Sequence, residues 1–147
     1  MTGRCLASAV LGIAMGLAAA QAAAGDDGER LFETNCAVCH MADGAGSPQL
    51  APPLRNELWK RLGAKGPDYL ASVMISGLVA VPLDGVRYAA AMPQWLQLSD
   101  VQLAAIGTHV LKKLNGTKVA VTPAQVKRAR DTAPGAAELK AMRSGGS

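Results

Sequence analysis

Cys36-Ala37-Val38-Cys39-His40 is the stretch that decides how the rest of this 147-residue chain is interpreted. Cys-x-x-Cys-His is the attachment signature of a c-type haem. Two thiols three positions apart on a helical turn can each form a thioether with one of the two haem vinyl groups. The imidazole that follows the second thiol then lies under the iron and ligates it. Cys36, Cys39 and His40 are therefore the first candidate haem-binding residues.

Three other chemistries also fit a Cys-x-x-Cys pair. The two thiols fit a disulfide, a thioredoxin-like redox pair, or half of a zinc site. A structural zinc site takes four ligands, and beyond residue 24 the chain offers only Cys36, Cys39, His40 and His109. A thioredoxin-like pair is expected beside a βαβ pattern, which the sequence does not contain. Haem is therefore the preferred interpretation.

Residues 1–24 have the pattern of a secretory signal peptide. Arg4 precedes an uncharged apolar run over residues 6–20, and Ala22-Ala23-Ala24 has the small residues of a cleavage site. The run is short and rich in Ala and Gly for a membrane-spanning helix, although an uncleaved anchor stays an alternative. We expect export and a mature chain of 123 residues, which suits one domain.

Glycine and phenylalanine precede the signature at helical spacing. With Gly28 and Phe32, the pattern reads Gly-x-x-x-Phe-x-x-x-Cys-x-x-Cys-His, which resembles the opening of the class I cytochromes c. The resemblance implies an all-α fold with three main helices around one covalent haem, a small β-like hairpin and a C-terminal extension. It also implies that the first helix crosses the C-terminal helix of the haem domain at Gly28.

Met92 is the predicted sixth ligand of the iron. It lies 52 residues after His40 on an irregular segment, where a loop can bring a thioether to the opposite face of the haem. A His/Met iron is the pattern of electron-transfer cytochromes, and the pair Met92-Pro93 resembles a bacterial subgroup of the family. Met74 and His109 are alternatives. Met74 belongs to an apolar helical stripe, and His109 is expected to pack against Gly28 at the helix crossing.

Pro52 is expected to fix the iron-binding histidine. The segment Pro52-Pro53-Leu54 is similar to the family's segment on the histidine side of the haem. In the family, a proline carbonyl there accepts the Nδ1 proton of the imidazole, and we assign that role to Pro52. Such an acceptor orients an imidazole and strengthens it as a ligand.

Periodicity and capping signals predict the remaining elements of the domain. Trp59 lies in a short helix and either borders the haem, donates its indole N–H to a propionate, or belongs to the core. Ser99 and Gln102 form a capping box at the start of the clearest helix. Asp84-Gly85 between two apolar runs is a hairpin signal. The expected helices cover residues 26–37, 56–62, 67–76 and 99–114.

The positive charge of the chain is concentrated in its C-terminal part. Residues 25–117, the expected haem domain, carry eight basic and nine acidic side chains, whereas residues 118–147 carry six basic and two acidic ones. We expect this basic extension to lie outside the compact core, with a capped helix from Thr122-Pro123, a break at Pro134-Gly135, a last helical turn and a disordered end. A Thr-Pro-x-x-Val segment also resembles the bacterial subgroup, so the extension can alternatively wrap the core.

The expected function is single-electron transfer, not enzymatic catalysis. The chain is interpreted as a periplasmic mono-haem carrier that serves a donor and an acceptor protein, such as a dehydrogenase, reductase or terminal oxidase. A basic tail can attract acidic surfaces, anionic lipid or nucleic acid. Export excludes nucleic acid, and a membrane becomes a partner only if the leader is retained. Two alternatives stay open: a haem c subunit of a periplasmic dehydrogenase or reductase complex, and a haem enzyme or sensor whose iron Met92 does not bind.

Overall fold

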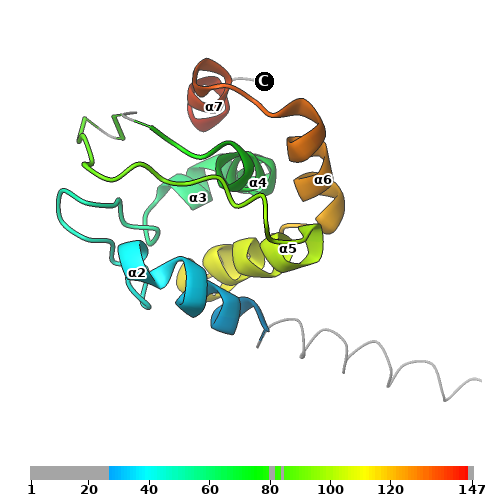
Figure 1. Cartoon of the computed structure of the whole chain (residues 1–147), viewed down its shortest axis with the longest axis horizontal. Helices are drawn as coiled ribbons and strands as arrows, with labels where there is room; N and C mark the ends of the chain where they lie inside the picture. Colours follow the sequence, from blue (N-terminus) through cyan, green and yellow to red (C-terminus); the bar gives the residue numbers. More distant parts are fainter. Residues whose placement is uncertain (1–26, 80–81, 84, 146–147) are drawn as a thin grey trace, which may run out of the picture.

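The computed structural model describes residues 27–79, 82–83 and 85–145 (Figure 1). The first element in these ranges is a helix over residues 27–35. The expected leader, residues 1–24, lies outside these ranges. Cys36 is a single turn residue between this helix and α2 (Ala37–His40). The later elements are α3 (Leu58–Leu62), η1 (Gly63–Lys65), α4 (Gly66–Ser76), α5 (Asp100–Thr108), η2 (His109–Leu114), α6 (Pro123–Thr132) and α7 (Ala136–Arg143).

The first helix lies against α5, as the resemblance implies (Figure 1). A Cβ atom at Gly28 would come within 2.5 Å of the carbonyl oxygen of Ala105, so only glycine allows this approach without a shift of the backbone. One turn later, Phe32 is fully buried, with its ring centroid 5.2 Å from that of His109. The expected packing of His109 at the crossing is thus confirmed.

The predicted helix over residues 99–114 forms in two parts. The capping box is present, because the Ser99 side chain accepts a hydrogen bond from the Gln102 N–H and the Gln102 side chain accepts one from the Ser99 N–H. After α5, the helix widens into the π-helical segment η2 (His109–Leu114). Asn115 ends it by donating hydrogen bonds to the carbonyls of Val110 and Leu54, at 2.8 and 2.9 Å.

The predicted hairpin turn is present as a tight pairing without extended strands. Leu83 and Val86 exchange both backbone hydrogen bonds, at 2.9 and 3.0 Å. Asp84, between them, lies outside the described residues, and Gly85 has φ of +81°. Within the described ranges the β-type contacts are isolated bridges, in agreement with the all-α fold class.

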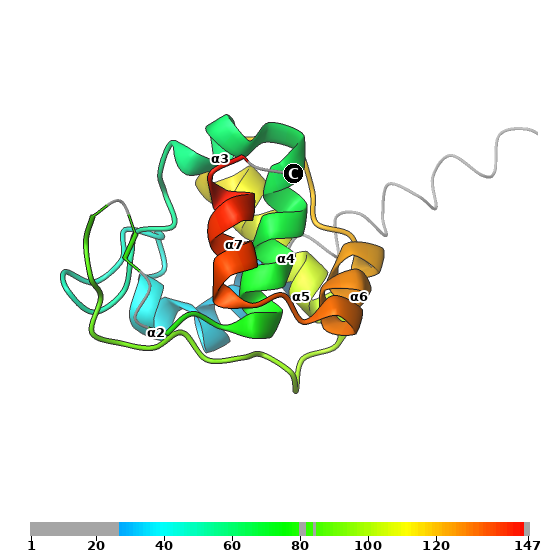
Figure 2. The same ribbon diagram turned by 90° about the horizontal axis from the view of Figure 1, so that it is seen from above.

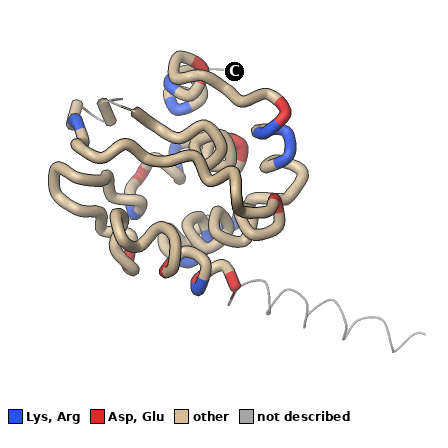
Figure 3. The backbone as a smooth tube through the Cα atoms, viewed as in Figure 1, with Lys and Arg blue, Asp and Glu red and all other residues tan. Residues whose placement is uncertain are grey.

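The C-terminal extension packs on the core, so its expected place outside the core is wrong and the alternative, that it wraps the core, is confirmed. Helix α6 packs against α4 and α5, and α7 lies along α4 (Figure 2). The helices are rich in Lys and Arg (Figure 3), but their apolar residues recur at helical spacing and face inward. Four residues of the extension are buried in the same cluster as the haem domain: Val121, Val126, Ala129 and Leu139. The boundary at residue 117 stays a prediction.

None of the helices in the described ranges is both long and apolar enough to cross a membrane.

Candidate haem site

A cavity lies between the cysteine motif, α4 and the segment that carries Met92. It consists of two adjoining hollows with about 820 and 1050 Å³ of space that protein atoms do not fill, including space open to solvent. Most of the side chains around them are apolar. The residues that line both hollows are Cys36, His40, Pro52, Leu78, Leu83, Tyr88 and Met92. Each of the five predicted haem-site residues lines at least one hollow.

His40, at the end of α2, is held by the carbonyl of Pro52. The distance from its Nδ1 to the Pro52 oxygen is 2.9 Å. A carbonyl oxygen only accepts, so Nδ1 carries the proton and Nε2 keeps its lone pair. Burial lowers the pKa of His40, although the bond to Pro52 opposes this shift, so the imidazole is neutral at neutral pH. A neutral, oriented imidazole is the form that ligates a metal.

Cys36 and Cys39 are half-buried and are not bonded to each other. Burial, and to a smaller extent the neighbouring Cys39, raises the pKa of Cys36 to about 12, so this thiol is protonated at neutral pH. The described residues contain no cluster of three or more His, Cys, Asp or Glu side chains that can hold a metal ion. The zinc interpretation therefore lacks ligands in this part of the chain.

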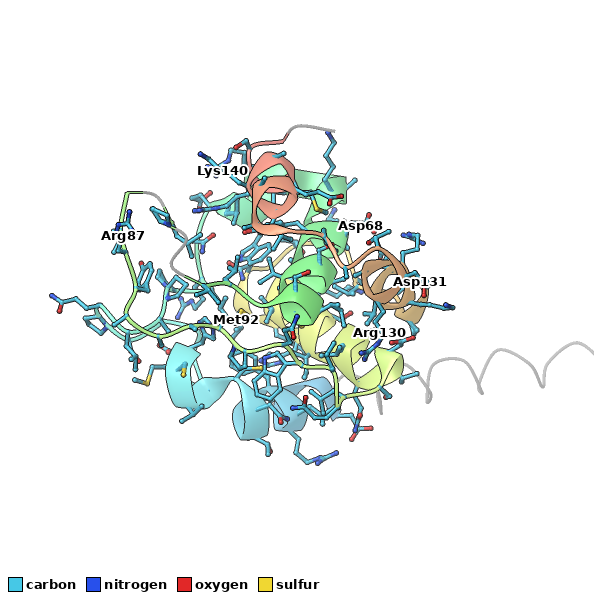
Figure 4. The ribbon with its side chains drawn as sticks, turned by 45° about the horizontal axis from the view of Figure 1, so that its top comes forward. Asp68, Arg87, Met92, Arg130, Asp131 and Lys140 are labelled. Atoms are coloured by element: carbon cyan, nitrogen blue, oxygen red, sulfur yellow. The ribbon has the colours of Figure 1, made fainter. Side chains whose placement is uncertain are left out.

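Met92 is fixed by a close approach of two backbone segments. Its N–H donates to the Leu78 carbonyl at 2.8 Å, and the Leu78 N–H donates to the Met92 carbonyl at 3.1 Å. A Cβ atom at Gly77 would lie 2.6 Å from the Met92 carbonyl oxygen, and Gly77 has φ of +68°. Figure 4 shows Met92 between α4 and the helical segment of the cysteines. The sequence does not indicate this role of Gly77, because its contact with Met92 joins residues that are 15 positions apart.

The structure separates Met92 from the two alternative ligands. Met74 is 3 % exposed within the core and lines only the larger hollow. His109 lines neither hollow. Trp59 is a core residue, and its indole N–H donates to the Leu54 carbonyl at 2.6 Å. The indole has a single N–H, and Leu54 already accepts it. This contact therefore argues against the predicted donation to a propionate.

The donors around the cavity fit a c-type haem. Two thiols, an imidazole with a free Nε2 and a thioether border one largely apolar space, and this donor set is that of a His/Met cytochrome. Residues 25–113 match the family model described as Cytochrome c.

The chain belongs to the cytochrome c family. It is 34% identical over 123 residues to a cytochrome c-552 of Thermus thermophilus, a match that covers 78% of this chain and 79% of that protein. It is 30% identical over 110 residues to the cytochrome c subunit of a quinone alcohol dehydrogenase of Gluconobacter oxydans. That match covers 74% of this chain and only 23% of the subunit.

Membership of this family assigns the cofactor and the general function. The cytochrome binds haem c covalently and transfers electrons, as its family model and its relatives indicate. The expected class I fold agrees with the helical architecture described above.

Proposed function

We propose that this cytochrome is a periplasmic carrier of single electrons whose haem is attached through Cys36 and Cys39 and ligated by His40 and Met92. When bound, the haem supplies an iron that accepts and donates one electron. The main support is that a neutral imidazole and a thioether, from segments 52 residues apart in the sequence, both line the two hollows of one cavity.

Each proposed residue has a separate task. Pro52 keeps the His40 ring in one orientation and one tautomer through the 2.9 Å hydrogen bond. Met92 contributes a neutral sulfur, and its backbone N–H and carbonyl are both hydrogen-bonded to Leu78. A thioether and an apolar surrounding both favour the reduced iron, so we expect a higher potential than that of a haem with two imidazoles.

His40 and Met92 would both hold the iron, which would leave no coordination position for a substrate. This supports a carrier rather than an enzyme or a gas sensor. The cavity also reaches the surface at apolar side chains: Val38 and Val86 line it and are 77 % and 45 % exposed. We propose that donor and acceptor proteins meet the haem edge there, in small and transient contacts.

A role as the haem subunit of a dehydrogenase complex is the second candidate. It is favoured by the similarity to cytochrome c subunits of quinone alcohol dehydrogenases, although this chain matches only about a quarter of the length of those subunits. Purification from the native host separates the two roles. A free carrier elutes alone, whereas a subunit elutes with a dehydrogenase.

The domain organisation is part of the same proposal. Residues 1–24 direct export, residues 25–117 form the haem domain and residues 118–147 form the basic extension. Removal of the leader leaves a periplasmic protein, and its retention would tether the haem domain to the membrane surface.

Replacement of methionine by leucine tests the ligand assignment. Leucine keeps the volume of methionine and removes its sulfur. We expect Met92→Leu to abolish the weak long-wavelength band that a sulfur ligand gives the oxidised haem. The potential should fall by a substantial part of the roughly 0.8 V that axial ligands span.

Met74→Leu is the matched control, because it removes a buried sulfur from the same cavity wall. This variant should keep both the band and the potential. A pyridine haemochrome spectrum first verifies that each variant carries covalent haem. An unchanged band in Met92→Leu, or its loss in Met74→Leu, would contradict the assignment.

A further inference from the structure

Arg143 is the one cationic side chain among the described residues that line the haem cavity. Among the described residues, those that line the smaller hollow include no Lys, Arg, Asp or Glu, and those that line the larger hollow include Arg143 alone of these four types. It is the last residue of α7 (Ala136–Arg143), 103 positions after His40. A residue of the C-terminal extension therefore reaches the site that the haem motif defines.

The packing of α7 accounts for the position of Arg143. Leu139, one turn earlier and on the same face of the helix, is 3 % exposed in the core, and Met142 packs against the same cluster. Just beyond the helix, the Nζ of Lys65 donates to the Gly145 carbonyl at 3.0 Å. Arg143 itself is half-buried. Helix α7 is thus held along α4 (Figure 2), with this guanidinium at the wall of the cavity.

Two neutral donors of the cavity wall, Trp59 and Asn56, are directed at backbone carbonyls. Trp59 donates its indole N–H to Leu54, and Asn56 donates to the Pro53 carbonyl at 2.7 Å. Haem c carries two propionates, which are anionic at neutral pH. A carboxylate in a partly buried, apolar place needs a strong donor or a cation, and the planar guanidinium of arginine fits a carboxylate with two parallel hydrogen bonds.

We propose that Arg143 binds a haem propionate, so that the C-terminal extension supplies the cation of the haem pocket. This contact requires the haem to occupy the cavity as proposed above. A guanidinium beside a propionate offsets its negative charge. It also favours the reduced iron, which carries one positive charge less than the oxidised iron. Arg143 thereby raises the reduction potential and couples the extension to the redox centre.

The test is an equilibrium redox titration of the haem-loaded full chain. We expect Arg143→Gln to shift the midpoint potential downward, because the variant removes the cation. Arg143→Lys keeps the charge and should restore most of the shift, although a lysine makes no bidentate contact. Lys140→Gln is the matched control: it removes one positive charge from the same helix, at an exposed position, and should change the potential little. The shift in Arg143→Gln should also persist at high salt, which screens only exposed charges.

Two results would overturn the contact with the propionate. One is an equal shift in Arg143→Gln and Lys140→Gln, which would indicate a general effect of net charge. The other is a potential that is unchanged in Arg143→Gln or is not restored in Arg143→Lys. Failure of the haem site itself is distinguishable, because it would show in the wild-type protein as missing covalent haem or a missing sulfur band. Amide hydrogen exchange in α7 verifies that the helix stays docked in each variant.

Discussion

His109 is a polar residue that this cytochrome buries without hydrogen bonds to its ring nitrogens within the described ranges. It is 6 % exposed, and neither ring nitrogen has a hydrogen-bond partner in the described part of the protein. Burial lowers the pKa of His109. Glu29 and Glu33 on the first helix raise it, and Lys113 on η2 lowers it. The ring therefore stays neutral in the folded protein, where it contacts Phe32.

We expect His109→Phe to stabilise the protein. An unsatisfied buried polar group costs about 1–3 kcal/mol, and an apolar ring of similar shape avoids this cost. The gain should grow as the pH falls. Below about pH 6.5 the unfolded imidazole binds a proton, whereas the folded one, with its lower pKa, does not. The wild-type free energy of unfolding therefore decreases from pH 6.5 toward the folded pKa.

Denaturant unfolding of the haem-loaded protein at pH 8 and pH 5 measures this difference. His109→Gln keeps a buried polar group, so it should not share the gain at pH 8. Because glutamine does not titrate, this variant should still lose the wild-type dependence of stability on pH. If phenylalanine lowers the stability at both pH values, the helix crossing requires the imidazole.

At the scale of elements, Arg130 of α6 ties the extension to the segment that follows Met92. Its Nε donates to Asp100, at the start of α5, at 2.7 Å, and its terminal nitrogens donate to the carbonyls of Leu96 and Leu98. The ion pair is half-buried, with side-chain exposures of 26 % and 31 %. Figure 4 shows Arg130 on α6, next to α5. One guanidinium thus links three parts of the fold.

Arg130→Gln should therefore lower the stability by about 1–3 kcal/mol, the range for hydrogen bonds to a charged group. It should also speed amide exchange over residues 96–100. Lys127→Gln is the control on the same helix, because it breaks an exposed pair with Asp131, and such pairs contribute little. If both variants lower the free energy of unfolding equally, the contacts of Arg130 contribute no more to stability than an exposed ion pair.

Local chemistry made some elements predictable. The Ser99 capping box and the helix that begins after Thr122 depend on side chains three positions apart, so the sequence alone indicates them. The Asp84-Gly85 signal predicted the turn in the same way. By contrast, the sequence predicted the end of the helix after Ser99 at residue 114 but not its π-helical second half, nor the hydrogen bond from Asn115 to the Leu54 carbonyl, 61 positions away. No local pattern encodes such a contact.

The residues of the haem site also fall into those that the sequence indicates and those that only the packing indicates. The motif of Cys36 and His40 is local, and the Pro52 carbonyl was found through a resemblance that the 2.9 Å contact supports. Arg143 was missed, because six basic residues of the extension look alike in the sequence and only the docking of α7 on α4 distinguishes one of them.

At the scale of the whole molecule, the cavity lies inside the hydrophobic core rather than beside it. Residues of the core cluster line the larger hollow, and three of the five aromatic residues of the chain are among them. The core residues that face this hollow are Phe32, Leu58, Trp59, Tyr69, Leu70, Val73, Met74, Ile106 and Val110. Each of these side chains therefore packs against the rest of the core on one side and would contact the cofactor on the other.

We expect the protein without haem to lose cooperative folding. Without haem, the nine core side chains that line the larger hollow lack contacts on one side. The cavity left by truncating one large side chain costs about 2–5 kcal/mol. Because haem is several times larger than such a side chain, the cost of its absence is comparable with the whole margin of a domain, about 5–15 kcal/mol. A Cys36→Ala/Cys39→Ala double variant, freed of haem, should show weak near-ultraviolet circular dichroism, a broad thermal transition and binding of a hydrophobic dye, the behaviour of a compact state without fixed packing. Cys36→Ala alone leaves Cys39 as one attachment point and should unfold cooperatively with its haem. A sharp transition in the haem-free double variant would instead show that the helices, with α6 and α7 docked, form a stable core around an empty space.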